Sequence, residues 1–151
     1  MAVDVLTQIV IDCPREIVAK YAANPDNAPK WYVNIIEARW ESSPPLDLGS
    51  RIAFVADFLG RRLAYTYEII EFEPGVRLVM STKAGLFPME TTYIWEDSGE
   101  SSTLMKLRNR GSPSGFSRLF APFMAVSMRR ANNKDLQLLK RLLEGGITSI
   151  D

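Results

Sequence analysis

Histidine is absent from the sequence, and cysteine occurs only once, at Cys13. Without histidine the chain lacks the most common general base and cannot form Ser-His-Asp or Cys-His catalytic arrangements. It also lacks the ligand used in most zinc and iron sites. A single cysteine cannot form an internal disulfide. We therefore expect no metal site and a reducing, cytoplasmic location.

An excess of either charge is also missing, because 18 Lys and Arg residues balance 18 Asp and Glu residues. This balance disfavours nucleic acid and anionic membranes as partners. The apolar run over residues 119–128 is too short to cross a bilayer, which takes about 20 residues. The first 12 residues alternate, unlike a secretory signal. We expect no nucleic-acid binding and no stable membrane insertion.

Motifs for the common enzyme classes are missing as well. The chain has no phosphate-binding glycine loop and no dinucleotide fingerprint, and the segment "GSPSG" carries Pro113 where a nucleophile elbow needs its nucleophile. Cys13, at a predicted helix start, is either a thiol of lowered pKa or an inert buried one, and we favour the inert thiol. No cofactor is expected, and the catalytic residues, if there are any, remain unknown.

Strand patterns dominate the first 110 residues. Residues 3–11 alternate, and a Pro-led helix (14–24) and a shorter helical segment (26–32), capped by Asp26, follow. Alternation then returns in six further segments, with a tight turn at Gly60 and a bulge near Ile69. We expect one domain, residues 1–151, with seven antiparallel strands.

A long amphipathic helix is predicted from residue 115 to residue 144. Pro122 must kink this helix or delay its start. Plotted at helical spacing, the phenylalanine and methionine side chains of residues 116–128 gather with Ser127 on the inward face. The same plot leaves Leu136 and Leu143 outside, where they could contribute to a homodimer contact.

These elements, in this order, resemble the START/Bet v 1-like (SRPBCC) superfamily, specifically its polyketide cyclase/dehydrase and lipid-transport group. Three stretches carry the resemblance, which covers residues 3–144: "IVIDCPREIVAKYAANPDNAPKW", "YEIIEFEPGVRLVM" and "TTYIWED". It implies an α+β helix-grip fold, in which a curved seven-stranded antiparallel sheet wraps around the long C-terminal helix and two short helices separate strands 1 and 2. It also implies a hydrophobic cavity between sheet and helix.

The candidate site consists of side chains that strand parity or helical phase directs into this cavity. The three tyrosine hydroxyls among them are the first candidates for orienting a ligand, unless they reach solvent at the sheet rim. The Phe and Met side chains of residues 116–128 either line this cavity or, as the alternative, pack in a filled hydrophobic core. The expected ligand-binding residues are Trp31, Phe54, Phe58, Tyr65, Tyr67, Met80, Tyr93, Trp95, Met105, Leu107, Asn109, Phe116, Phe120, Phe123, Met124 and Ser127.

Two functions follow from the resemblance and the candidate site. The first is binding or transport of a small hydrophobic ligand: a lipid, an isoprenoid or quinone-like compound, or an aromatic polyketide. The second is an enzyme of the cyclase or dehydratase type that acts on a ligand held in the same cavity. A groove that accepts an apolar segment of another protein is a third, weaker alternative.

Overall fold

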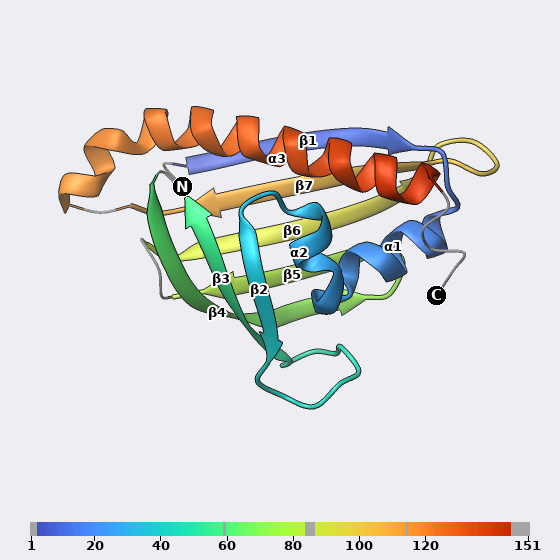
Figure 1. Ribbon diagram of the computed structural model, residues 1–151, viewed down its shortest axis with the longest axis horizontal. Coiled ribbons are helices and arrows are strands. Elements are labelled where there is room, and N and C mark those ends of the chain that lie inside the picture. The colour runs from blue at the N-terminus through green and yellow to red at the C-terminus, as the bar shows by residue number, and fades with distance from the viewer. Residues whose placement is uncertain (1–2, 59, 84–86, 114, 146–151) are drawn as a thin grey trace.

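The computed structural model describes residues 3–58, 60–83, 87–113 and 115–145, and only the backbone of residues 115–117. Seven antiparallel strands form one sheet in the order β1-β7-β6-β5-β4-β3-β2, so β1 and β2 are its edges (Figure 1). The arrangement is the predicted helix-grip fold. The strands are β1 (Val3–Ile11), β2 (Ile35–Trp40), β3 (Arg51–Phe58), β4 (Arg61–Glu73), β5 (Arg77–Thr82), β6 (Met89–Asp97) and β7 (Thr103–Gly111).

Three short helical segments connect β1 to β2: α1 (Arg15–Ala23), η1 (Pro25–Asn27) and α2 (Ala28–Trp31). The predicted cap at Asp26 is wrong, because Asn24 Oδ1 accepts the Asp26 backbone N–H at 3.0 Å. Asn24 precedes Pro25, whose fixed backbone starts the turn, so its side chain is the one placed to cap it. The Asp26 carboxylate instead accepts Trp40 Nε1–H at 3.0 Å, which ties this segment to β2.

The sheet follows the alternation of its sequence. Tyr93 on β6 lies opposite Leu107 on β7, and both are buried on the inner face. The predicted bulge is present, because the β4–β5 register shifts between Ile69 and Glu71. A bulge bends its strand, and the curvature leaves room above the inner face. Gly60 has a φ of 77°, a left-handed conformation that suits glycine in the β3–β4 turn.

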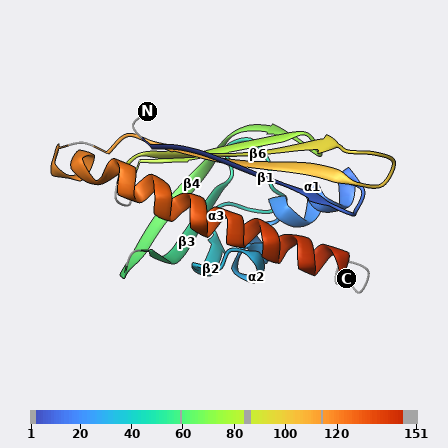
Figure 2. The ribbon, with the colours of Figure 1, turned by 90° about the horizontal axis from the view of Figure 1, so that it is seen from above.

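The long helix α3 (Ala121–Glu144) begins late, after the 3₁₀ segment η2 (Gly115–Phe120). Pro122 lies in its first turn, where a missing N–H leaves no hydrogen bond broken. Of the two predicted effects of Pro122, the structure therefore shows the delayed start. The helix runs beside β1, and its N-terminal end projects past the end of the sheet (Figure 2). Among the described residues, no helix is both long and apolar enough to cross a membrane.

The buried face of α3 differs from the predicted one by roughly a quarter turn. Leu136 and Leu143 are buried in the main core with Leu139, so the homodimer contact predicted through them is wrong. Phe120 and Phe123, predicted to face inward, are exposed instead. For Phe120 the cause is local, because this residue ends a 3₁₀ segment, which has three residues per turn and does not share the α-helical phase. Phe123 belongs to α3 itself, at the end of the helix that projects past the sheet.

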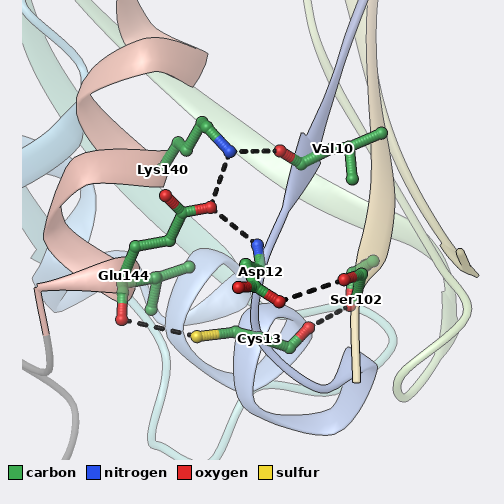
Figure 3. Close-up of polar contacts among 8 residues, drawn as sticks. Val10, Asp12, Cys13, Ser102, Lys140 and Glu144 are labelled. Carbon is green, nitrogen blue, oxygen red and sulfur yellow. Dashed lines mark hydrogen bonds and ion pairs between the residues drawn. The ribbon is translucent and has the colours of Figure 1, made fainter. Parts of the chain in front are cut away.

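Hydrogen bonds fasten the C-terminal end of α3 to the end of β1 (Figure 3). Lys140 Nζ donates to the Val10 carbonyl at 2.8 Å and to Glu144 Oε2 at 2.6 Å. The same Glu144 oxygen accepts the Asp12 backbone N–H at 2.7 Å. Cys13 Sγ donates to the Leu143 carbonyl at 3.4 Å. These contacts hold the helix to the sheet at the end opposite to its projecting N-terminus.

Cys13 is a structural thiol, as favoured from the sequence. Burial raises its pKa, and the carboxylates of Glu144 and Asp12 raise it further. A raised pKa reduces the thiolate fraction, and the thiolate is the nucleophilic form. Cys13 therefore contributes a contact to the end of α3, and its raised pKa favours the less nucleophilic thiol form.

Candidate ligand-binding cavity

A cavity of about 160 Å³ lies between the inner face of the sheet and α3. Most of its wall is apolar or aromatic, as expected for a site that takes small molecules. Strand parity correctly placed one group of side chains on this wall, all of them on β3 to β7. They are Phe54, Phe58, Tyr65, Tyr67, Met80, Tyr93 and Asn109.

Four other predicted wall residues belong to the packed core. Trp95, Met105 and Leu107 share the inner face with Tyr93, but they are buried in the core with the leucines of α3. They pack against other side chains and do not line the cavity. Trp31 is fully buried behind the cavity, with its ring centroid 4.2 Å from that of Tyr32 and 5.8 Å from that of Tyr93. It supports the tyrosines and does not line the cavity.

The predictions made from the N-terminal part of α3 are also corrected. Phe120 and Phe123 are exposed, because this end of the helix extends beyond the sheet. Met124 is buried in a second cluster with Val3 and Val5 and is not one of the side chains that line the cavity. Ser127 is only partly buried and does not line the cavity either, because the buried arc of α3 is rotated away from it. The Phe116 side chain lies outside the described residues.

Buried and half-buried tyrosines supply hydroxyl groups to the wall. The Tyr32 and Tyr93 hydroxyls lie 2.6 Å apart, so one donates to the other. The pair uses one of its two hydrogens, and the second can be donated to a ligand. Burial raises the pKa of Tyr32, Tyr65, Tyr67 and Tyr93, so all four phenols keep their protons at neutral pH. The tyrosines are therefore donors, not bases.

A second polar group joins β4, β6 and β7. Thr91 Oγ1 lies 2.6 Å from Asn109 Oδ1 and 3.3 Å from the Tyr67 hydroxyl. Because Thr91 has a single hydroxyl hydrogen, it donates in the shorter contact, to Asn109. The Tyr67 hydrogen can then be donated to Thr91 or to a ligand. Asn109 thus orients Thr91, and through it Tyr67.

Sequence reasoning missed the carboxyl group of the site, which belongs to Asp135 on α3. Its side chain is buried, and Oδ1 accepts the Val33 backbone N–H at 2.9 Å. Burial raises the pKa of Asp135 to about 7, although the Val33 hydrogen bond opposes the shift. A carboxyl with this pKa exchanges its proton near neutral pH, which is what a general acid or base requires.

Asn132, one turn before Asp135, completes the polar side of the wall. It is buried, and among the described residues its Nδ2 has no hydrogen-bond partner. A sequence signal for both residues existed. Asn132, Asp135, Leu136, Leu139 and Leu143 recur at helical spacing on one face. Two polar residues within an otherwise apolar helix face indicate that the face contacts a polar site in addition to the hydrophobic core.

Gly111 at the end of β7 allows another wall residue to pack closely. A side chain at this position would overlap the Phe87 ring and the Met89 sulfur. Both of these side chains line the cavity, and sequence reasoning did not include them. Glycine is required here for close approach of side chains to the backbone.

A single curved sheet that holds a long helix over a partly apolar cavity defines the helix-grip class of ligand-binding folds. The chain belongs to the family described as polyketide cyclase / dehydrase and lipid transport, which it matches over residues 2–144. No curated protein has a sequence that matches it.

Solved structures share the fold at low sequence identity. TTHA0849 from Thermus thermophilus has a TM-score of 0.80 at 19% identity, covering 94% of this chain and 98% of that one. The Zhui aromatase/cyclase from Streptomyces sp. R1128 has a TM-score of 0.80 at 11% identity, with coverages of 95% and 94%. The di-domain ARO/CYC BexL of the BE-7585A biosynthetic pathway has a TM-score of 0.77 at 17% identity, covering 93% of this chain and 46% of that one. At these identities the likeness concerns the fold alone.

Proposed function

We propose that the protein binds a small ring compound that carries carbonyl or hydroxyl oxygens. The observation that carries this proposal is the buried Asn132 amide, whose N–H group has no partner among the described residues although it lines the cavity. A buried donor without an acceptor is costly, and a ligand oxygen would satisfy it. The aromatic wall around it provides stacking surface for a ring.

The size of the cavity favours compact ligands over long chains. A cavity of about 150 Å³ holds one benzene molecule, and typical ligand pockets measure about 300–1,000 Å³. At about 160 Å³, this cavity accommodates one ring, with a second reaching toward its open side. Among the ligands considered from the sequence, a quinone-like or aromatic polyketide ring fits better than a lipid chain.

Filling the cavity should prevent binding. Ala131 lines the wall from α3, and Ala131→Phe places a benzene-sized ring in a space that holds about one such ring. We expect the affinity for 2-naphthol, followed by its fluorescence, to fall at least tenfold. Gln137→Phe adds the same ring to an exposed position of the same helix and should leave binding unchanged. Equal affinities of both variants would contradict a ligand site in this cavity.

The polar groups should select for oxygen on the ligand. Tyr67→Phe removes one hydroxyl but keeps the ring, so we expect the affinity for 2-naphthol to fall about fivefold, the effect of one hydrogen bond. Naphthalene, which has no hydroxyl, is the control ligand and should bind the variant and the parent protein with the same affinity. The ratio of the two dissociation constants measures this selectivity. An unchanged ratio would remove Tyr67 from the polar contacts.

A second function, catalysis of the cyclase or dehydratase type, is favoured by Asp135. Its pKa of about 7 lets the carboxylate remove a proton next to a ligand carbonyl, while the protonated phenols of Tyr32 and Tyr93 stabilise the resulting enolate oxygen. Native mass spectrometry of the purified protein, followed by extraction of the guest, separates the functions. A guest released unchanged after incubation supports binding, whereas turnover supports the enzyme.

A further inference from the structure

Exposed apolar side chains are concentrated at the N-terminal end of α3. Leu119 is 73% exposed, Phe123 is 60% exposed and Val126 is 58% exposed. Single exposed apolar residues are normal on a protein surface, but contiguous ones indicate an interaction site. Of the eleven large hydrophobic side chains exposed among the described residues, four fall within residues 119–126. The cavity uses none of these four.

Basic side chains continue the same surface. Phe123, Val126, Arg130 and Lys134 lie three, four and four residues apart and therefore share one face of α3. Arg130 and Lys134 are exposed, and no described residue forms an ion pair with either of them. We call Leu119, Phe123, Val126, Arg130 and Lys134 the outer patch.

The chain segment that carries the outer patch has charge of one sign. Residues 101–134 include no Asp or Glu, although the whole chain is neutral. The overall balance therefore conceals a local excess of positive charge. Both ribbon views show that this end of α3 projects past the sheet, so a flat surface can reach it (Figures 1 and 2).

We propose that the outer patch docks the protein on the surface of an anionic lipid membrane. Phe123 and Val126 enter the boundary between headgroups and acyl chains, and Arg130 and Lys134 contact the negative headgroups. This combination of exposed apolar side chains with basic ones is typical of helices that lie at a membrane interface. Docking needs no transmembrane segment. The Met128 and Ala131 side chains of the same helix line the cavity, which places the docked surface next to the ligand site.

Vesicle flotation of the full chain tests the proposal without any ligand for the cavity. We expect binding to vesicles of phosphatidylcholine and phosphatidylglycerol (7:3), little binding to phosphatidylcholine alone, and release at high salt. R130Q/K134Q should lower the partition coefficient about 30-fold, because each basic residue near an anionic surface contributes about 1 kcal/mol, which is about fivefold. F123S/V126S should lower it as well. L48S and R39Q alter exposed side chains elsewhere and should bind as the parent protein does.

Several outcomes would overturn the proposal. They are absence of binding to the anionic vesicles at low salt, or equal binding by the parent protein and R130Q/K134Q when circular dichroism shows both to be folded. A dimer that F123S/V126S dissociates, without vesicle binding, would assign the outer patch to a second copy of the chain. The Ala131→Phe variant keeps the outer patch and should still bind vesicles, so failure of the cavity proposal and failure of the docking proposal are distinguishable.

Discussion

We expect the Asp135→Asn substitution to stabilise the protein increasingly as the pH rises. The free energy of unfolding of the variant minus that of the parent protein should be about 4 kcal/mol larger at pH 8 than at pH 4. Burial raises the pKa of Asp135 from 3.8 to about 7, so the folded protein holds this proton more tightly than the unfolded chain does. Stability from Asp135 is complete below pH 3.8 and decreases as the pH rises toward 7. Asparagine is neutral at every pH, and its oxygen can still accept the Val33 N–H.

Urea unfolding of both proteins between pH 4 and pH 8 measures this effect, with fluorescence of the buried Trp31 and Trp95 as the signal. Other carboxylates titrate in both proteins, so only the difference between the two curves reports Asp135. Glu37→Gln, which changes an exposed carboxylate elsewhere on the surface, is the control for a substitution that removes one acidic group. Parallel curves for Asp135→Asn would mean that Asp135 is ionised at no cost in the folded state.

The strand half of the site could be predicted from sequence because parity is a local property. Phe54 and Tyr67 face the cavity because residues two apart share a face of the sheet. Parity cannot say where the cavity ends. Tyr93 lines it and Trp95 does not, although both are on the inner face of β6. That boundary depends on which side chains of α3 cover each part of the sheet, and this is tertiary information.

The site residues predicted on α3 were wrong for a different reason. The predicted phase of α3 follows from the aromatic residues near its start, and those residues lie in a 3₁₀ segment and in a helix end that projects past the sheet. Once the phase is taken from Leu136, Leu139 and Leu143, Asp135 falls on the inner face. The same error assigned Phe123 to the cavity, whereas its exposure is the basis of the outer patch. A chain segment rich in apolar residues can thus lie on the surface of the protein and need not line a cavity or fill the core.

If Asp135 acts as a base, the protein should accelerate hydrogen exchange at carbon next to a ketone. We expect 2-tetralone, a two-ring ketone, to exchange its α-hydrogens in D₂O at least 100-fold faster with the parent protein than with Asp135→Asn, the usual contribution of a positioned base. The exchange rate, followed by NMR, should rise with pH and level off above about 7, because only the carboxylate form removes the proton. Ala131→Phe should also abolish the acceleration, since it excludes the ketone from the cavity. If the parent protein binds 2-tetralone but exchange stays at the solvent rate, catalysis through Asp135 is wrong, and its raised pKa reflects burial beside a site that only binds.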